Sequence, residues 1–367
     1  MIRFEHVTKR YADGTTAVDD LSFDVAEGEL VTLVGPSGCG KTTTMKMVNR
    51  LIEPTEGRIF LDGEDISTVD PVRLRRRIGY VIQQVGLFPH RTVLDNTATV
   101  PHLLGVPRAR ARARAAELLD LVGLDPGTYG DRYPEQLSGG QRQRVGVARA
   151  LAADPPVLLM DEPFGAVDPV VRERLQSEFL RLQSQVRKTV LLVTHDLEEA
   201  VRLGDRIAVY GQGTIEQFAA PATVLGAPAT PYVADFVGAD RGLKRLSVTP
   251  VEESHLEHPP TVRAGDAFDA PWAVLLDADG RPEGWVSAEH PEHTRQTPAP
   301  LPLGASLREA LAALLQDDTG RLPVIDPVDG GRYAGVLTPA GIHRALRRAA
   351  PETPAPETPP AQKLSSR

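Results

Sequence analysis

Short apolar runs alternate with amphipathic helical segments along the first part of the chain. The apolar runs are rich in β-branched residues, which is typical of strands buried on both faces of a sheet; they lie at 29–34, 78–82, 157–160 and 189–193. Helical patterns lie at 43–51, 142–152 and 197–203. Segments 2–7 and 18–25 instead alternate apolar and polar residues, which predicts paired strands at a sheet edge. Together the patterns predict an α/β fold with a largely parallel sheet covered by helices.

A glycine-rich loop joins the strand at 29–34 to the helix that follows it. Residues 35–42 fit the phosphate-binding pattern G-x-x-x-x-G-K-[ST] at every required position. Glycines allow backbone N–H groups to surround a polyphosphate, and the helix N-terminus adds the positive end of its dipole. Lys41 would contact the β- and γ-phosphates, and the hydroxyl of Thr42 would bind Mg²⁺. The loop therefore predicts a nucleotide site.

Other predicted strands end in polar side chains. Asp161 and Glu162 follow the strand at 157–160, and adjacent carboxylates at a strand end point to opposite faces. One can bind Mg²⁺ while the other contacts a water molecule. His195 follows the strand at 189–193. A single histidine is more often structural, but this one is expected at the same edge of the sheet as the phosphate loop, which favours a functional role. Gln83, also at a strand end, is either a Mg²⁺ or water ligand or an ordinary surface residue.

A second glycine-rich helix start follows at residues 137–141. Ser138 is a suitable N-cap, and Gly139 and Gly140 leave the N–H groups of the first turn bare for an anion. A plain helix cap is the alternative. Tyr11 lies in a turn-rich segment, where its ring either stacks on an adenine or is an ordinary surface side chain; the residues alone leave both open.

The composition is that of an ordinary soluble globular protein, with 41% hydrophobic and 25% charged residues in 367. A formal charge of −8 argues against a general nucleic-acid binder. The single cysteine, Cys39, excludes an internal disulfide framework and fits a reducing compartment. We expect neither a secretory leader nor a membrane-spanning segment, since no apolar run is long enough. Any role at a membrane would then depend on a partner.

Taken together, the motifs resemble the ATP-binding subunit of an ABC transporter over about residues 1–238. The resemblance implies a P-loop NTPase cassette with a RecA-like core, an antiparallel β edge and a helical subdomain at about 84–153. It resolves the ambiguity over Tyr11 in favour of stacking on adenine. The residues that it implies for nucleotide binding are Tyr11, Gly35, Pro36, Ser37, Gly38, Cys39, Gly40, Lys41, Thr42, Thr43 and Gln83.

The same resemblance implies an ATPase that uses Mg²⁺, with ADP and phosphate as products. Asp161 would bind Mg²⁺ with Thr42 and Gln83, and Glu162 would be the catalytic base. Lys41 and His195, the switch histidine, would assist hydrolysis. Asp168 matches the aspartate of the D-loop at the dimer contact. The family signature corresponds to Ser138, Gly139, Gly140 and Gln141, which would act in trans.

In that family the signature of one subunit completes the ATP site of another. Two copies of the chain would therefore enclose ATP head to tail as a homodimer. Glu162 would activate water for in-line attack on the γ-phosphate. A pure regulatory nucleotide module without turnover is disfavoured, because Lys41, Asp161, Glu162 and His195 are all present.

A narrower resemblance to importers of quaternary-ammonium osmoprotectants is carried by 83–90, 99–104 and 240–247. It implies transport of glycine betaine, choline, carnitine or proline betaine through integral permease subunits, fed by an extracytoplasmic binding protein. The chain would lie peripherally at the cytoplasmic face of the membrane, with the permease contact near 85–90. An importer ATPase for another solute, such as an amino acid, stays open. A soluble ABC ATPase is disfavoured by the single cassette and its compact helical insertion.

The C-terminal third has a different composition. We expect a linker at 239–258 and a proline-rich, disordered tail at 350–367. Residues 259–349 resemble a degenerate pair of CBS repeats, a small α+β domain, at about 259–290 and 303–349. The first repeat has Ala267–Pro271 in place of a long helix, which favours a structural or dimerising module over a ligand sensor. A proline-rich connection is expected at 294–302.

Overall fold

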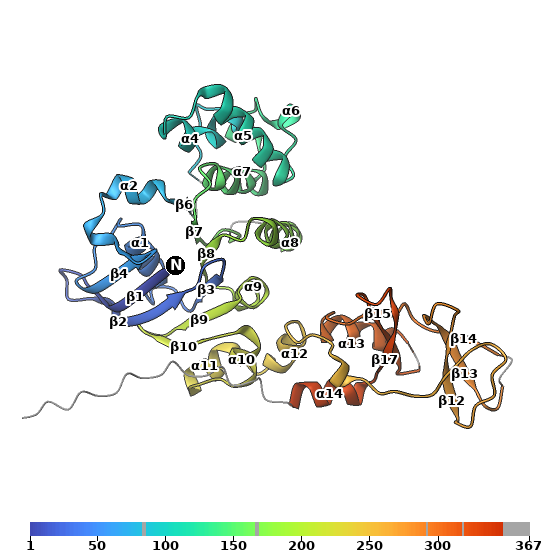
Figure 1. Cartoon of the computed structure of the whole chain (residues 1–367). Helices are drawn as coiled ribbons and strands as arrows, with labels where there is room; N and C mark the ends of the chain where they lie inside the picture. The colour runs from blue at the N-terminus through green and yellow to red at the C-terminus, as the bar shows by residue number, and fades with distance from the viewer. Residues whose placement is uncertain (83–85, 166–168, 291–292, 318, 348–367) are drawn as a thin grey trace, which may run out of the picture. The chain divides into compact units, whose positions relative to one another are not determined.

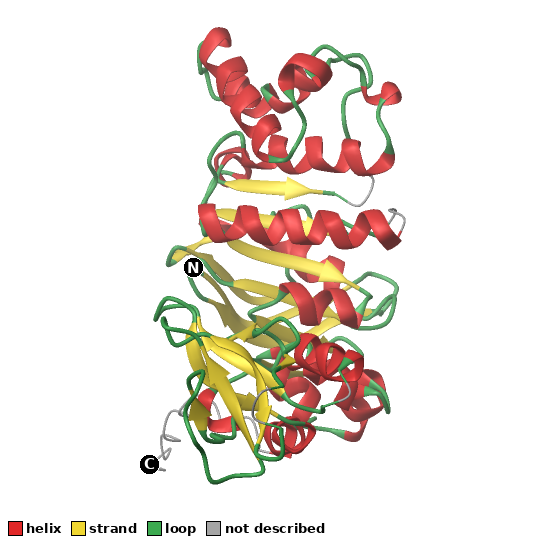
Figure 2. Cartoon of the chain, turned by 90° about the vertical axis from the view of Figure 1, so that its right-hand side faces the viewer, coloured by secondary structure: helices red, strands yellow, loops and turns green. Residues whose placement is uncertain are grey.

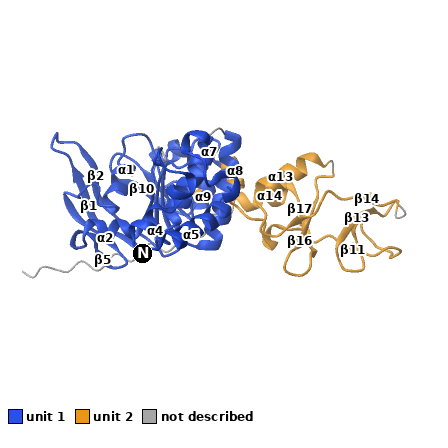
Figure 3. Cartoon of the chain, turned by 90° about the horizontal axis from the view of Figure 1, so that it is seen from above, with its two compact units in different colours: residues 1–224, 228–241 blue, residues 225–227, 242–367 orange. Residues whose placement is uncertain are grey.

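The computed structural model describes residues 1–82, 86–165, 169–290, 293–317 and 319–347. Gln83, Asp168 and the expected tail at 350–367 lie outside the described residues. The chain divides into two compact units, shown in Figure 3. Unit 1 comprises 1–224 and 228–241, and unit 2 comprises 225–227 and 242–367. Each unit is described by itself below.

A six-stranded sheet forms the centre of unit 1, in the order β10-β9-β3-β8-β7-β6. Neighbouring strands from β9 to β6 run parallel, and β10 pairs antiparallel at the edge. The strands span Leu30–Val34 (β3), Ile78–Val81 (β6), Val157–Asp161 (β7), Thr189–Thr194 (β8), Arg206–Tyr210 (β9) and Ile215–Ala219 (β10). The predicted parallel α/β architecture is confirmed.

The sheet separates two hydrophobic cores because successive side chains on a strand point to opposite faces. In β3, Val31 and Leu33 join one core and Leu30 joins the other; in β8, Leu191 and Val193 alternate in the same way with Val190 and Leu192. The first core contains α1 (Lys41–Val48) and the second contains α7 (Gly139–Leu151) and α8 (Pro169–Val186). A further helix, α9 (Leu197–Leu203), packs beside β3. Figure 2 shows the strands layered with these helices.

A second, antiparallel sheet covers the α1 side of the core in the order β2-β1-β4-β5. Its strands are Ile2–Arg10 (β1), Thr16–Val25 (β2), Glu56–Leu61 (β4) and Glu64–Asp65 (β5). Their alternating burial explains the alternating sequence pattern: Ile2, Phe4 and Val7 point into the core. A 3₁₀ turn (Ile66–Thr68) and the short helix α2 (Pro71–Arg76) follow β5.

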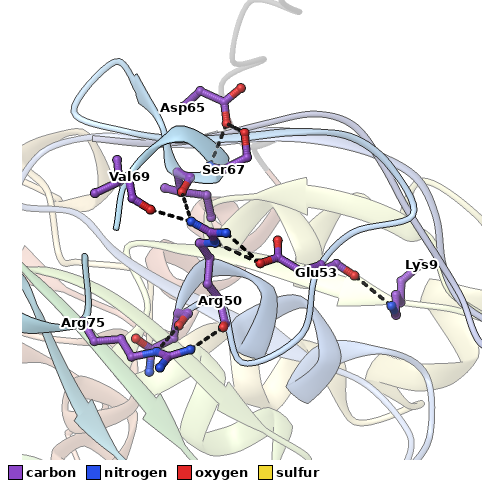
Figure 4. A network of polar contacts seen from close by, with 9 residues as sticks. Lys9, Arg50, Glu53, Asp65, Ser67, Val69 and Arg75 are labelled. Atoms are coloured by element: carbon purple, nitrogen blue, oxygen red, sulfur yellow. Dashed lines mark hydrogen bonds and ion pairs between the residues drawn. The ribbon is translucent and has the colours of Figure 1, made fainter. Parts of the chain in front are cut away.

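A polar network fastens the chain beyond α1 to this sheet (Figure 4). Arg50 donates to the carbonyl oxygens of Ile66 at 2.9 Å and Val69 at 2.5 Å, and pairs with the carboxylate of Glu53 at 2.9 Å. Arg75 in turn donates to the carbonyl of Arg50, and Lys9 of β1 to that of Glu53. The end of the helix that follows the phosphate loop is thereby held in place by several charged hydrogen bonds.

The helical part of unit 1 is drawn at the top of Figure 1. It contains α3 (Val93–Thr97), α4 (Thr99–Leu103), α5 (Arg108–Leu121), α6 (Pro126–Tyr129), a 3₁₀ turn (Pro134–Gln136) and α7. Ala111, Ala115, Leu118 and Leu119 of α5 are buried, whereas Arg108, Arg110 and Arg114 are exposed. The arginine run therefore forms the solvated face of an amphipathic helix.

Two further helices precede unit 2 proper: α10 (Pro221–Gly226) and α11 (Pro231–Val237). Helix α12 (Arg241–Leu246) and a 3₁₀ turn (Glu253–His255) then occupy the segment that the sequence analysis expected to be a linker. Leu246, Val251 and Leu256 are buried in the hydrophobic core of unit 2. These residues are thus packed into the C-terminal unit.

Unit 2 contains two small sheets of similar connectivity, in the orders β11-β12-β13-β14 and β15-β16-β17. In each, a two-residue strand pairs parallel with the first strand of an antiparallel hairpin. The strands span Thr261–Val262 (β11), Trp272–Leu276 (β12), Pro282–Ser287 (β13), Arg295–Gln296 (β14), Leu301–Pro302 (β15), Leu322–Asp326 (β16) and Arg332–Leu337 (β17). The segment at 294–302, expected as a plain connection, therefore contributes two short strands.

Helices distinguish the two sheets of unit 2. Helix α13 (Leu307–Gln316) lies between β15 and β16, and α14 (Pro339–Arg347) follows β17. Ser306 caps α13 in a capping box with Glu309, as its sequence predicts. Between β11 and β12, residues 263–271 contain no helix.

Candidate functional site

The phosphate loop between β3 and α1 requires glycine at particular positions. Gly40 has φ 105°, and a Cβ there would lie 2.1 Å from the carbonyl oxygen of Ala17 in β2. Gly35 has φ 155°, and its Cβ would lie 2.7 Å from the carbonyl oxygen of Tyr210. Any larger residue would clash with backbone atoms that cannot move aside cheaply. The loop therefore fits closely between β2 and the end of β9.

Lys41 lies inside this loop and is only 6% exposed. Its Nζ donates to the carbonyl oxygens of Gly35 at 2.7 Å and Pro36 at 2.8 Å, and lies 3.4 Å from Sγ of Cys39. The two carbonyl groups are neutral, so they orient the ammonium without cancelling its charge. A buried positive charge beside a helix N-terminus is an arrangement suited to phosphate.

Thr42 and Asp161 meet at the next position along the site. Oγ1 of Thr42 donates to Oδ1 of Asp161 at 3.1 Å, which joins the first turn of α1 to the end of β7. Burial raises the pKa of the Asp161 carboxyl, while the hydrogen bond from Thr42 opposes that shift. The hydroxyl and carboxylate oxygens are donors that Mg²⁺ prefers, and a nucleotide site usually supplies the other ligands from phosphate and water. The described residues hold no cluster of three or more histidine, cysteine or acidic side chains that would suit another metal.

Glu162 and His195 form an acid–imidazole pair at the same edge of the sheet. Nδ1 of His195 lies 3.2 Å from Oε1 of Glu162. The backbone of Glu162 has φ 45°, an uncommon conformation for a residue with a side chain, and its N–H donates to the carbonyl of Val193 at 2.9 Å. Glu162 is 24% exposed and His195 57% exposed at the side chain, so both are accessible to water. Strain at such a position is often found at functional sites.

The second predicted anion site is the start of α7. Ser138 accepts from the N–H of Gln141 at 3.2 Å, and the Gln141 side chain accepts from the N–H of Ser138 at 2.9 Å. Ser138 and Gly139 of this capping box are exposed, whereas Gly140 is buried. Figure 1 places α7 in the helical part of unit 1, apart from α1 in the core. The structure thus groups the loop, Asp161, Glu162 and His195, while residues 138–141 lie elsewhere on the same chain.

Tyr11 lies in a turn closed by a hydrogen bond from its own N–H to the carbonyl of Thr15 at 2.9 Å. The ring is 39% exposed, with the ammonium of Lys9 at 5.4 Å from its centroid. The side chain therefore lies at the surface.

Two residues near the site were not singled out from the sequence. Tyr210, fully buried under the loop, donates to Oγ1 of Thr44 at 3.1 Å, and its carbonyl accepts from the hydroxyl of Tyr232 at 3.0 Å. Glu199 is a buried carboxylate on α9, four positions beyond His195. Its exposed neighbour Glu198 has the same residue type, so no pattern in the sequence distinguishes them.

Comparison with known proteins agrees with this geometry. The family model described as ABC transporter matches residues 18–165. An osmoprotectant import ATP-binding protein of Salmonella typhimurium is 45% identical, over 92% of this chain and 94% of that protein. A glycine betaine/carnitine/choline transport ATP-binding protein of Bacillus subtilis is 43% identical, over 93% of this chain and 95% of that protein.

Solved structures give the same result for the cassette. A dimeric bacterial ABC transporter cassette has a TM-score of 0.55 and 37% identity, over 60% of this chain and 99% of that one. A dimeric cassette in a post-hydrolysis state with ADP and phosphate has a TM-score of 0.54 and 36% identity, over 60% of this chain and 99% of that one. Within the described part of this chain, no helix has the length and apolar character needed to cross a membrane.

Proposed function

Because this chain belongs to the family of ATP-binding subunits of ABC transporters, we propose that it hydrolyses ATP to energise the import of quaternary-ammonium osmoprotectants through a membrane permease. The observation that carries the hydrolytic part is the convergence of Lys41, Thr42, Asp161, Glu162 and His195 at one edge of the sheet. The solute class rests on relatives that match nearly the whole chain, unit 2 included.

The residues divide the work of hydrolysis between them. Lys41 neutralises negative charge on the β- and γ-phosphates, and the amide groups of the loop bind their oxygens. Thr42 and Asp161, with Gln83, would hold Mg²⁺, which would supply further neutralisation of phosphate charge. Glu162 positions the attacking water in line with the γ-phosphate and accepts a proton from it. His195 holds the Glu162 carboxylate and contacts the transferred phosphoryl group.

A second copy of the chain completes each site. The exposed N-terminal turn of α7 provides N–H groups and the Ser138 hydroxyl for the γ-phosphate of the partner's ATP, with Asp168 at the dimer contact. The separation of α7 from α1 within one chain supports this arrangement (Figure 1). Two of the similar cassettes were solved as dimers. The adenine would stack on Tyr11, whose ring is accessible.

The permease would contact the chain near 85–90 and on the adjoining helical part of unit 1. Phe88 there is 40% exposed, and Leu103 at the end of α4 is also exposed. Large exposed apolar side chains of this kind are common at protein interfaces. The chain would then lie peripherally at the cytoplasmic face of the membrane, and an extracytoplasmic solute-binding protein would deliver the solute. Residues 259–349 of unit 2 would be a degenerate CBS pair with a structural or dimerising role.

Substitution of Glu162 by Gln tests the catalytic assignment. The amide keeps the shape of the side chain but accepts no proton, so turnover should fall by about 100-fold or more. The dissociation constant for ATP, measured by equilibrium titration with a fluorescent analogue, should stay within about twofold of the wild-type value, because Lys41 and the loop are unchanged. Undiminished hydrolysis by this variant would show that another group activates the water.

Uptake measurements test the solute. The chain would be reconstituted in proteoliposomes with its permease and binding protein, and glycine betaine, choline, carnitine and proline betaine would be compared with proline and glutamate. ATP-dependent uptake of at least one quaternary ammonium compound is expected. Uptake confined to the amino acids would contradict the proposed solute class. It would not affect the assignment of the chain as an ATPase, since none of the residues above contacts the solute.

A further inference from the structure

The turn that carries His195 rests on a buried carboxylate. Strand β8 ends at Thr194 and α9 begins at Leu197, so His195 lies in a short connection between them. Glu199, in the first turn of α9, is only 5% exposed. An ionised carboxylate that is removed from water requires hydrogen-bond donors, so its partners reveal what the carboxylate organises.

Those partners form a chain of hydrogen bonds that runs toward Glu199 from both sides. On one side, the N–H of Asp196 donates to Oγ1 of Thr194 at 3.0 Å, and the Thr194 hydroxyl donates to Oε2 of Glu199. On the other side, Arg202 donates to Oε1 of Gln176 at 3.3 Å, and Nε2 of Gln176 lies 3.5 Å from Oε1 of Glu199. Every donor in the chain points toward the carboxylate.

This direction depends on Glu199 accepting at both oxygens. The Thr194 hydroxyl has one proton and two lone pairs, so it donates to Glu199 and still accepts from the N–H of Asp196. Gln176 cannot reverse its amide, because its NH₂ group would then face the guanidinium of Arg202. An amide at position 199 has one accepting oxygen, so it cannot accept from the Thr194 hydroxyl and the Gln176 amide at the same time, as the carboxylate does.

The network joins β8, through Thr194, to α8, through Gln176. Thr194 pairs across the sheet with Val34, the residue before the phosphate loop. Gln176 lies on α8, buried against α9. His195, between Thr194 and Asp196, is 3.2 Å from the carboxylate of Glu162. The hydrogen bond from Asp196 to Thr194 spans His195 and fixes the peptide units on both of its sides.

We infer that Glu199 is a positioning residue for hydrolysis, which orients His195 against Glu162 by holding the hydroxyl of Thr194 and the amide of Gln176. This inference rests on the proposed role of His195 in hydrolysis. Glu199 itself contacts neither nucleotide nor water in the reaction. Burial raises the pKa of Glu199, and the Asp196 carboxylate adds to the shift, while the hydrogen bonds from Thr194 and Gln176 and the charge of Arg172 oppose it. A buried carboxylate of this kind weakens the fold, which is consistent with a role beyond packing.

The test compares Thr194→Val, Thr194→Ser and Glu199→Gln in the full-length protein. Thr194→Val removes both hydrogen bonds of the hydroxyl at nearly constant volume, and kcat for ATP should fall by about tenfold. KM for ATP should stay within about twofold, because the phosphate loop is unchanged. Thr194→Ser keeps the hydroxyl and should restore kcat. Glu199→Gln should lower kcat in the same direction, whereas Glu198→Gln on the exposed face should leave it unchanged.

Adding Thr194→Val to His195→Ala separates the inference from the proposed function. If Thr194 acts through His195, the second substitution should lower the residual rate no further. An additional tenfold loss would overturn the inference, as would unchanged kcat in both Thr194→Val and Glu199→Gln. A wild-type rate in His195→Ala would instead refute the proposed role of His195. Glu199→Gln, which preserves side-chain volume, decides the matter if Thr194→Val does not fold.

Discussion

The two units of the molecule differ in what they bury. Among the described residues, the buried polar and charged side chains of unit 1 include Lys41, Asn49, Asn96, Gln143, Asp161, Gln176 and Glu199. In unit 2 His255 is the one buried side chain of this kind among the described residues. Burial of polar groups is unfavourable unless each is paired, so unit 1 holds groups that a fold selected for stability alone would replace.

The location of these groups explains the difference. Lys41, Asp161 and Glu199 lie at or beside the carboxyl ends of β3, β7 and β8, where a parallel sheet binds its ligand. His255 of unit 2 instead closes its own turn, where its Nδ1 accepts from the N–H of Glu252 at 3.1 Å. At these three positions of unit 1 polar burial therefore serves the proposed chemistry, whereas at His255 of unit 2 it serves the local fold. Substitutions at the site in unit 1 should accordingly lower turnover more than stability, and substitutions in unit 2 should lower stability more than turnover.

The largest expected effect comes from Asp161→Asn. Loss of the carboxylate charge should lower ATP turnover by about 100-fold or more at fixed Mg²⁺ concentration. The free energy of unfolding of unit 1 should not fall, because the amide oxygen still accepts from Thr42 and a buried charge with a raised pKa is gone. Turnover assays at varied Mg²⁺ and urea unfolding followed by far-UV circular dichroism measure the two quantities.

Asp205→Asn is the matched control for this variant. The Asp205 carboxylate accepts from the N–H of Leu30 at 2.8 Å, at the opposite end of β3 from the phosphate loop. Turnover should remain within about twofold of the wild type, since an amide oxygen can also accept this bond. A large loss of turnover in both variants would mean that activity follows general damage to the sheet, and the contrast between the strand ends would fail.

A pair of core substitutions should separate the units next. Leu322→Ala in β16 and Leu191→Ala in β8 remove the same atoms from fully buried positions, each at an expected loss of about 2–5 kcal/mol in the stability of its own unit. Only Leu191→Ala should also lower turnover, because β8 carries Thr194 and the turn with His195.

The tryptophans make this pair easy to measure. Both, Trp272 and Trp285, lie in unit 2, so their fluorescence follows the unfolding of that unit alone. Leu322→Ala should move the fluorescence transition to lower urea concentration and leave kcat within about twofold. Equal losses of turnover in the two variants would indicate that unit 2 is needed for hydrolysis.

Segments with a strong periodic pattern were predicted better than the other segments, for physical reasons. Buried parallel strands and the helix at 197–203 have strong periodic patterns, and the structure has them within one or two residues of the expected bounds. The helix Pro169–Val186 was not predicted. Residues 239–258 had too few apolar positions to predict that Leu246 and Val251 are buried.

The candidate site shows the same limit at the level of single residues. Motifs identify side chains that contact a ligand, so the loop and the strand ends were found from local spacing. The geometry that couples Glu162 to His195 depends on the pairing of β7 with β8, which local spacing does not specify. Glu199 and Glu198 differ only in which face of α9 they occupy, and that face is determined by the packing of α9 against β3 and β8.

The smallest expected effect, the pH dependence of stability in Glu199→Gln, tests whether unit 1 keeps a charge that weakens its fold. Burial raises the pKa of Glu199 in the folded protein above its ordinary value of 4.5, so the folded state binds the proton more tightly than the unfolded state. This contribution to stability is fully present below the unfolded pKa and is lost as pH rises through the folded pKa.

The glutamine of the Glu199→Gln variant does not titrate. The stability difference between the two proteins should therefore shift in favour of the variant as pH rises through that range, and then stay constant. Urea unfolding of both proteins across the range measures the difference, and Glu198→Gln should show none. If Glu199→Gln is instead the less stable protein at neutral pH, the carboxylate stabilises the fold, and the contrast between the two units does not extend to this residue.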